Sequence, residues 1–198
     1  MRSVDTLHLG RQGKNNFSSI DIPVLEEFCV GKRVLDIGCA NGDVVKYLRQ
    51  KNTEAYGVDG DINAIEIFSD PSIRDFLICH DYTKGKSNIT KTIDMVISMD
   101  FCEHVEEKYI DNYMKDFLLG NTIILHTPPK GSAGHNHVNT QDREYWILLF
   151  AQYGAKFDKR LTEQVRMVSD YHNPVDMAYY EKKPRKLPKH NYLVFNKK

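Results

Sequence analysis

Residues 34–43 read VLDIGCANGD, an apolar run followed by a short turn that contains two glycines. Turns of this kind commonly place a phosphate on the N-terminus of a helix. Here, however, Asp36 precedes the turn, and the spacing from Gly38 to Gly42 does not fit the GxGxxG pattern of dinucleotide binding. A carboxylate at this place disfavours pyrophosphate and suits a cation. The stretch therefore predicts a ligand with a nucleoside, no phosphates and a positively charged end.

Short apolar runs alternate with amphipathic segments on both sides of this turn. The runs predict strands at 33–38, 54–60, 75–81, 93–100 and 121–128, and the segments predict helices at 42–50, 62–68, 106–119 and 140–153. Such alternation is typical of βαβ units in a parallel sheet with helices on both faces. Segments 156–168 and 191–198 look like strands, and we expect them to form an antiparallel pair at one edge. The predicted fold is α/β, a Rossmann-like doubly wound and mainly parallel sheet.

Composition restricts the class of protein. The chain has 198 residues, which suits one domain over residues 1–198, with 1–22 as an N-terminal lid segment. Its formal net charge is zero, which argues against binding to nucleic acid through bulk charge. The four cysteines form no CxxC pair and are expected to be buried free thiols. Because no signal-peptide core or bilayer-length apolar stretch is seen, we expect a cytoplasmic protein without a membrane partner.

Further acids follow the next two predicted strands. Asp59 comes after the second run, and an acid about 20 residues past a glycine turn accepts hydrogen bonds from ribose hydroxyls. The third run ends in His80, Asp81 and Tyr82. We expect Asp81 to accept from an adenine amino group, with Tyr82 beside the ring. Together with the cation preference of Asp36, these features predict S-adenosyl-L-methionine as the ligand.

The segments VLDIGCANG, YGVDGD, CHDYT and IDMVISMDFCEHV resemble, in order and spacing, four motifs of the class I S-adenosylmethionine-dependent methyltransferases. The resemblance covers residues 31–154. It implies that the chain is a methyltransferase of the small single-domain type. It also implies the following cofactor-binding residues: Asp36, Gly38, Cys39, Ala40, Gly42, Asp59, Gly60, Asp81, Tyr82, Met99 and Asp100.

The segment after the fourth strand contains Asp100, Glu103 and His104 in a DxxEH arrangement, for which three interpretations remain open. In the first, these residues only begin a helix. In the second, His104 is a general base that removes a proton from the methyl acceptor. In the third, the three side chains and a loop histidine bind a divalent metal. The third resembles the ExxEH motif of small-RNA 2′-O-methyltransferases and ubiquinone-biosynthesis O-methyltransferases. Because Asp100 stands where the ExxEH motif has its first Glu, we favour the second interpretation, a histidine base that acts without a metal.

The stretch 131–146, GSAGHNHVNTQDREYW, follows the fifth strand and contains two glycines and two histidines. We expect His135 and His137 to face the acceptor and to be catalytic together with His104. Asn139 is expected to be the N-cap of the next helix, and Trp146 to be in the core. The basic run 181–189 suits a solvated loop or a contact to phosphate.

Three functions remain in competition. The leading one is methylation of an oxygen or nitrogen on a small-molecule acceptor, such as a sugar-like metabolite. The alternative is an RNA 2′-O-methyltransferase-like enzyme with the DxxEH metal site, and zero net charge weighs against this nucleic-acid partner. The third, from another class, is a non-catalytic subunit that binds S-adenosylmethionine. The acceptor, the methylated atom and the oligomeric state do not follow from the sequence.

Overall fold

The computed structural model describes residues 20–170 and 191–197. Most of the predicted lid segment and the basic run 181–189 lie outside the described residues. None of the described helices is both long enough and apolar enough to cross a membrane.

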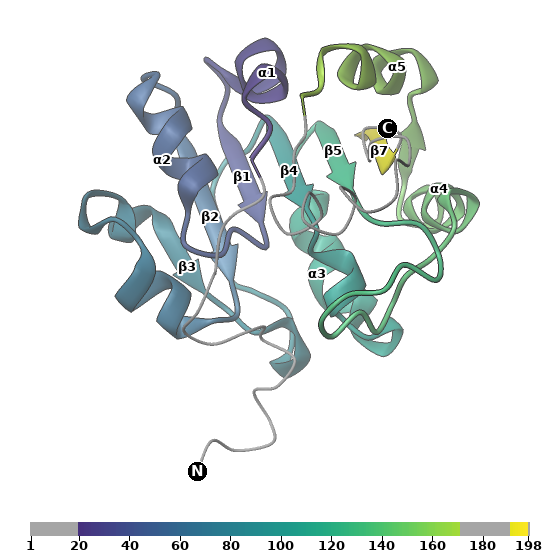
Figure 1. Ribbon diagram of the computed structural model, residues 1–198, viewed down its shortest axis with the longest axis horizontal. Coiled ribbons are helices and arrows are strands. Elements are labelled where there is room, and N and C mark those ends of the chain that lie inside the picture. Colours follow the sequence, from purple (N-terminus) through teal and green to yellow (C-terminus); the bar gives the residue numbers. More distant parts are fainter. Residues whose placement is uncertain (1–19, 171–190, 198) are drawn as a thin grey trace, which may run out of the picture.

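The described strands form one sheet in the order β3-β2-β1-β4-β5-β7-β6 (Figure 1). Their bounds are β1 Val34–Ile37, β2 Ala55–Asp59, β3 Leu77–Cys79, β4 Met95–Met99, β5 Thr122–His126, β6 Ala155–Phe157 and β7 Tyr192–Lys197. Strands β3, β2, β1, β4 and β5 are parallel, and β7 runs antiparallel to both β5 and β6. The predicted fold class and the antiparallel edge pair are confirmed. The strand order reverses between β1 and β4, which is where ligands bind in such sheets.

Helices cover both faces of the sheet. The bounds of the α-helices are α1 Ile22–Val24, α2 Asp43–Gln50, α3 Ile110–Phe117, α4 Arg143–Gln152 and α5 Lys159–Val168. Apolar side chains of α1, α2 and α5 pack on one face, and those of α3 and α4 pack on the other. Every residue of β1 and β4 is buried, as expected for central strands that are covered on both faces.

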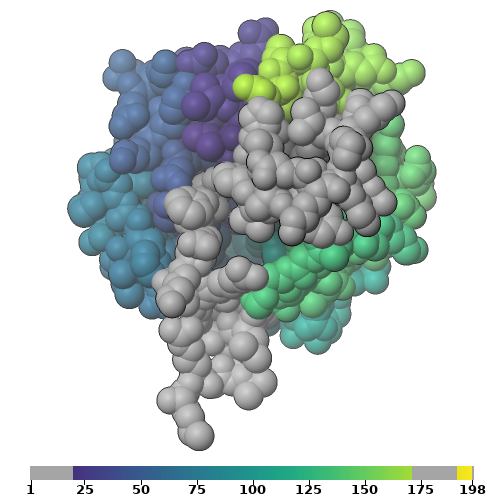
Figure 2. Space-filling model, in the orientation of Figure 1, coloured from purple at the N-terminus to yellow at the C-terminus, as the bar shows by residue number. Residues whose placement is uncertain are grey.

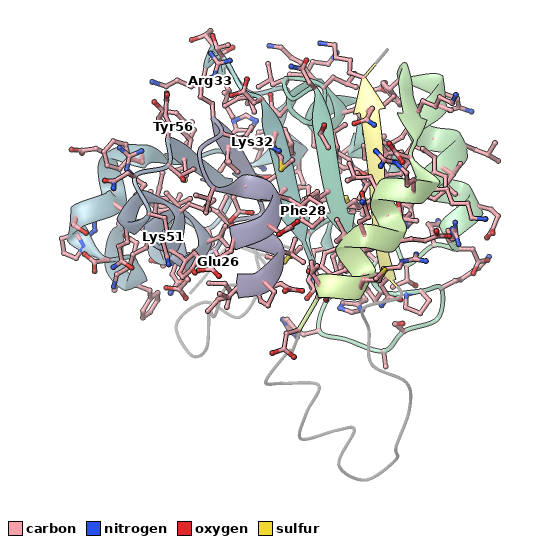
Figure 3. All side chains as sticks on the ribbon, turned by 90° about the horizontal axis from the view of Figure 1, so that it is seen from above. Glu26, Phe28, Lys32, Arg33, Lys51 and Tyr56 are labelled. Carbon is pink, nitrogen blue, oxygen red and sulfur yellow. The ribbon has the colours of Figure 1, made fainter. Side chains whose placement is uncertain are left out.

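Short helical turns occupy the remaining connections. They are η2 Leu25–Cys29, η3 Ala64–Phe68, η4 Pro71–Phe76, η5 Tyr82–Lys84, η6 Cys102–His104 and η7 Glu107–Tyr109. Seen from above in Figure 3, Glu26 of η2 points toward Lys51, and their side chains form an ion pair of 3.0 Å. Both groups are exposed, so this pair contributes little to stability.

The buried Asp21 joins both ends of the described chain. Its Oδ2 accepts hydrogen bonds from the Ser169 hydroxyl at 2.6 Å and the Tyr192 hydroxyl at 2.9 Å. On the surface in Figure 2, the purple segment around α1 accordingly lies beside the yellow-green α5. The start of the described chain is therefore held at the carboxyl end of the sheet.

The prediction of a strand over 156–168 is wrong for most of its length. Only Ala155–Phe157 pair as β6, and Lys159–Val168 form α5. The Asp158 side chain caps this helix by accepting from the backbone N–H of Leu161 at 2.8 Å. Leu161 and Val165 then follow at helical spacing, which fits a helix better than a strand. A second correction concerns Cys79, which is exposed because it ends the edge strand β3, whereas the other three cysteines are buried.

A buried carboxylate connects the turn after β3 to α3. Asp116 is fully buried in α3, and its two oxygens accept from the Tyr82 hydroxyl at 2.6 Å and the Ser87 hydroxyl at 2.7 Å. The ring of Tyr82 packs edge-on against Phe101 and Tyr113. The segment that follows β3 is therefore tied to the core, although β3 lies at the sheet edge.

We predict that Asp116→Ala destabilises the fold, because two buried hydroxyl donors lose their acceptor. At about 1–3 kcal/mol for each of the two unsatisfied buried groups, the free energy of unfolding should fall by about 2–6 kcal/mol. Urea denaturation measures this, with the exposed Asp75→Ala as a matched control that should change it by less than about 0.5 kcal/mol. Equal effects of the two substitutions would contradict the role of Asp116 as the buried acceptor for both hydroxyl groups.

Candidate active site

The turn between β1 and α2 needs glycine at both of its ends. Gly38 and Gly42 have φ values of 82° and 81°, in the left-handed region that favours glycine. A Cβ on Gly38 would lie 2.5 Å from the Phe101 side chain, and one on Gly42 would lie 2.8 Å from Ile73. Ala40, between them, also adopts a positive φ of 47°. The turn is therefore tightly wound and closely packed.

The carboxylate of Asp59, at the end of β2, holds this turn. Its Oδ2 accepts from the backbone N–H of Ala40 at 2.9 Å, and its Oδ1 accepts from that of Asp61 at 2.8 Å. Burial raises the pKa of Asp59, although the backbone N–H groups partly offset this rise. Gly60, also predicted to bind the cofactor, lies half-buried between the two acids. The acids predicted at the ends of β1 and β2 are thus parts of one structural unit.

Asp36 lies inside the sheet, beside β2 and β4. It is opposite Gly57 on β2 and Ile97 on β4, and only 3% of its surface is exposed. Burial raises the pKa of Asp36 to about 8, and the nearby Asp59 carboxylate adds to this rise. Two carboxylates in a buried place favour either a proton or a bound cation. This supports the prediction that the turn attracts a positively charged group.

Some predicted cofactor residues have packing roles in the structure. Cys39 is buried, and its sulfur occupies the space that a Cβ on Gly57 would need. Asp81 caps the turn η5, because its Oδ1 accepts from the backbone N–H and the hydroxyl of Thr83 at 2.8 and 2.7 Å. Tyr82 is buried and bonded to Asp116, so we assign its ring to the core and not to an open place beside an adenine.

The end of β4 is joined to β5 through Asp100, a residue with a positive φ of 54°. Its backbone N–H donates to the carbonyl of His126, and its Oδ1 lies 2.9 Å from His126 Nδ1. His126 is buried and its ring packs against Tyr192, whose hydroxyl lies 3.5 Å from the sulfur of the buried Met99. The sequence makes His126 a candidate because it lies near the end of the fifth predicted strand, but it assigns this residue no role.

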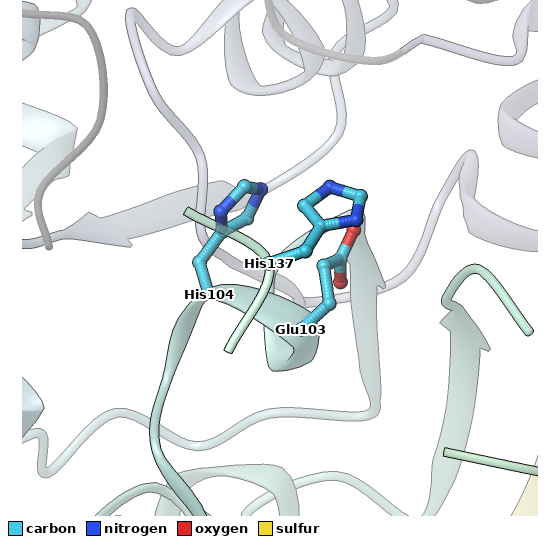
Figure 4. A group of neighbouring side chains, drawn as sticks. All are labelled: Glu103, His104 and His137. Atoms are coloured by element: carbon cyan, nitrogen blue, oxygen red, sulfur yellow. The ribbon is translucent and has the colours of Figure 1, made fainter. Parts of the chain in front are cut away.

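Three side chains beyond β4 form a compact group, which we call the His-Glu group: Glu103, His104 and His137. One potential ligand atom from each lies within 4.8 Å of the others. Figure 4 shows the Glu103 carboxylate and both imidazole rings turned toward a common space. Of the set that the metal interpretation predicted, the structure brings together Glu103, His104 and one loop histidine, His137, whereas Asp100 contacts His126 and is not part of this group.

Backbone contacts hold the loop that carries His137 against η6. The carbonyl of Glu103 accepts from the N–H groups of Val138 at 2.8 Å and Asn139 at 3.0 Å. The ring of His137 lies where a Cβ on Gly134 would be, only 2.2 Å from that position, so the loop needs glycine there. Main-chain hydrogen bonds and close packing therefore position His137 beside Glu103 and His104, although His137 is distant from them in the sequence.

The hydrogen bonds of the two rings determine which nitrogen atoms carry lone pairs. His104 Nδ1 lies 3.2 Å from the carbonyl of Asn136, and His137 Nδ1 lies 3.2 Å from that of Ser132. A carbonyl only accepts, so in these contacts each Nδ1 donates and each Nε2 keeps its lone pair. Burial lowers the pKa of His104, and His137 adds to this effect. Two imidazoles and a buried carboxylate in this arrangement suit a bound cation.

Two other loop residues differ from their predicted roles. His135 is exposed and is absent from the His-Glu group, so the structure brings together only two of the three predicted catalytic histidines. Asn139 is not the N-cap of α4, because that helix begins at Arg143 with Asp142 as N-cap. It is instead buried, and its Oδ1 accepts from Gln141 at 3.1 Å. Trp146 is buried in the core, as predicted.

Residues 21–153 match a family model described as a methyltransferase domain. The protein named "Putative methyltransferase 235L", from Invertebrate iridescent virus 6, is 28% identical over 141 residues, which are 64% of this chain and 49% of that protein. The chain therefore spans about half the length of this curated relative.

Solved structures give a similar result for the fold. A magnesium protoporphyrin IX methyltransferase (ChlM) from Synechocystis PCC 6803 with bound SAM matches with a TM-score of 0.51 and 17% identity, over 70% of this chain and 66% of that one. A TehB-like SAM-dependent methyltransferase from Corynebacterium glutamicum matches with a TM-score of 0.57 and 16% identity, over 89% of this chain and 86% of that one. At these identities the likeness establishes the fold alone.

The raised pKa of Asp36 predicts how stability depends on pH. The folded protein keeps the Asp36 proton up to about pH 8, whereas the unfolded chain loses it near pH 4. Between these values the folded state binds more protons, so the free energy of unfolding should fall as pH rises from about 4 to about 8. Asp36→Asn should make this fall in the free energy of unfolding shallower. Part of the fall should remain, because the pKa of Asp59 is raised as well. Urea denaturation from pH 5 to 8.5 measures how the free energy of unfolding depends on pH in the wild type and in the variant. Identical slopes for the two proteins would refute the raised pKa of Asp36.

Proposed function

The chain belongs to the methyltransferase domain family, and we propose that it transfers a methyl group from S-adenosylmethionine to an oxygen of a small-molecule acceptor. The cofactor supplies an electrophilic sulfonium methyl group, so the main tasks of the protein are to position donor and acceptor and to handle the acceptor's proton. The observation that carries the proposal is the pair of carboxylates at the glycine turn, the buried Asp36 and the half-buried Asp59, both of which have a raised pKa.

The residues at the turn fit the chemistry of this cofactor. An acid pair with raised pKa values is relieved by the ammonium of a methionine group, and a phosphate there would be repelled. The backbone N–H groups of Ala40 and Asp61 donate to different oxygens of Asp59, and a carboxylate with about four lone-pair sites keeps capacity for a further donor, such as a ribose hydroxyl. We therefore assign the methionine end to Asp36 and the ribose to Asp59, with the adenine toward Asp81.

The His-Glu group supports an acceptor site beyond β4. Glu103, His104 and His137 follow the carboxyl end of the strand next to β1, on the side away from the predicted ribose site. We propose that they hold a divalent cation such as magnesium or manganese, which lowers the pKa of a bound hydroxyl. The protein's own part is to fix both imidazoles through the carbonyls of Asn136 and Ser132 and to keep the carboxylate buried.

The same group also favours the RNA 2′-O-methyltransferase alternative, because that class resembles this chain in its ExxEH motif. Zero net charge still supports the small acceptor, since binding to RNA depends strongly on phosphate contacts. A fluorescent single-stranded RNA separates the two functions. At about 150 mM salt the small-acceptor proposal expects no saturable binding, and tight binding there would favour the RNA alternative.

Replacing Asp59 tests the cofactor assignment. Hydrogen bonds to a charged group contribute about 1.5–3 kcal/mol each, so Asp59→Ala should weaken S-adenosylhomocysteine binding at least about tenfold. Calorimetry measures the affinity. Circular dichroism checks that the variant still folds, because the substitution removes the carboxylate that accepts from the Ala40 N–H in the glycine turn. The control is Glu54→Ala, an exposed acid just before the same strand, which should leave the affinity unchanged. Unchanged affinity in a folded Asp59→Ala protein would rule out the ribose contact.

Replacing the loop histidines tests the metal assignment. We expect the wild-type protein to bind one Mn²⁺, and His137→Ala or Glu103→Gln to weaken this binding at least about tenfold. His135→Ala is the matched control, because it removes an exposed imidazole from the same loop and should bind as the wild type does. Electron paramagnetic resonance of free Mn²⁺ measures the affinity. If the wild type binds no Mn²⁺, the metal assignment fails and the general-base interpretation of His104 is restored.

A further inference from the structure

The carboxylate of Asp100 lies beside the His-Glu group without belonging to it. Asp100 directly follows β4, and Glu103 and His104 belong to the next turn, η6. Burial lowers the pKa of His104, and the charge of Asp100 is one of the influences that oppose this lowering. Because the interaction of two charges weakens with distance, the Asp100 carboxylate is close to the His104 imidazole. An acid therefore stands at the border of the proposed metal site.

Two contacts with His126 hold Asp100 at that border. The Nδ1 of His126, at the end of β5, lies 2.9 Å from Oδ1 of Asp100, and an ionised carboxylate only accepts, so Nδ1 donates. The backbone N–H of Asp100 donates to the carbonyl of His126 at 3.1 Å. The Asp100 side chain is 20% exposed, whereas that of His126 is 2% exposed. The carboxylate thus has open space beside it, and its position depends on the hydrogen bond from His126.

The ring of His126 is itself fixed from the other side. It packs edge-on against Tyr192, with 4.8 Å between the ring centroids, and the two residues face each other in the pairing of β5 with β7. The hydroxyl of Tyr192 donates to the fully buried Asp21 at 2.9 Å. His126 is therefore held in the orientation in which its Nδ1 meets Asp100.

The number of carboxylates around a cation influences which metal a site prefers. Magnesium favours oxygen ligands, whereas imidazole nitrogen favours transition metals. With Asp100 held by His126, the His-Glu group offers the cation the carboxylate of Glu103 and the imidazoles of His104 and His137. A second carboxylate, from Asp100, would make the same site more suitable for magnesium.

We propose that His126 sets the metal preference of the His-Glu group by holding the Asp100 carboxylate outside it. The site then takes a transition metal such as manganese in preference to magnesium, which narrows the choice left open above. His126 is a positioning residue, since it acts on the cation only through Asp100. This inference rests on the metal site of the proposed function.

Removing the imidazole of His126 tests this role. In His126→Leu the Asp100 carboxylate loses its donor and can turn to the cation, so Mg²⁺ should bind at least about fivefold more tightly than to the wild type. His126→Asn is the matched control, because its amide keeps an N–H near the place of Nδ1 and should preserve the wild-type affinities. Electron paramagnetic resonance of free Mn²⁺ measures Mn²⁺ binding, and displacement of bound Mn²⁺ by Mg²⁺ gives the affinity for Mg²⁺.

Replacing Asp100 separates its release from a general disturbance of η6. Because Asp100 is not a ligand in the wild type, Asp100→Asn alone should change Mn²⁺ binding by less than about threefold, through the loss of a nearby charge. Combined with His126→Leu, it should remove the whole gain in Mg²⁺ affinity. A loss of about tenfold or more in Mn²⁺ affinity with Asp100→Asn alone would show that Asp100 is already a ligand, and would overturn the proposal.

The wild-type protein should need at least about a tenfold excess of Mg²⁺ to displace half of the bound Mn²⁺. Equal affinities for the two metals, or an unchanged Mg²⁺ affinity in a His126→Leu protein that circular dichroism shows to be folded, would overturn the proposal while the metal site itself stands. If His126→Leu does not fold, the wild-type preference and Asp100→Asn decide.

Calorimetry with S-adenosylhomocysteine on the same proteins separates these outcomes from the fate of the proposed function. If the wild type binds the cofactor product but no Mn²⁺, the metal site and this inference fail together and methyl transfer is retained. If it binds Mn²⁺ with the expected preference but not the cofactor product, the role of His126 stands and the proposed function fails.

Discussion

The carboxylates of the buried Asp36 and the half-buried Asp59 are the constraint on which the arrangement of the site depends. Asp59 holds the turn after β1 through the N–H of Ala40, and that turn determines where α2 begins. Asp36 lies beneath it, in the middle of the sheet, with its pKa raised to about 8 by burial and by Asp59. Keeping two acids in this place costs stability, and in the proposed function a cationic group of the ligand offsets that cost.

The remaining parts of the site follow from the order of the strands. Because β4 lies next to β1 and β5 lies next to β4, their carboxyl ends bring Asp100, His126 and η6 to the same edge of the sheet. The loop after β5 then returns to η6 through the carbonyl of Glu103, which places His137 beside His104. The proposed donor and acceptor sites are thus held by different loops on one sheet, an arrangement that allows an acceptor site to vary while a cofactor site is kept.

The fold and the glycine turn could be predicted from the sequence because they depend on local patterns: strand and helix periodicity, and acids at the ends of strands. The predictions failed where contacts between distant residues decide the structure. Asp100 is three residues from Glu103, yet its bond to His126 across the sheet takes it out of the DxxEH set. A loop histidine was expected beside Glu103, but which of the two it would be depends on the hydrogen bonds between the loop and η6, and these place His137 there. In 156–168, apolar residues are sparse, and the capping side chain of Asp158 was needed to distinguish the helix α5 from a strand.

The central claim is that one edge of the sheet holds donor and acceptor in a fixed relation. A crystal structure with S-adenosylhomocysteine bound tests it most directly. The account predicts the ribose hydroxyls at the carboxylate of Asp59, the ammonium near Asp36, and the sulfur directed toward Glu103, His104 and His137. A ligand bound elsewhere, or one whose sulfur faces away from these three side chains, would contradict it.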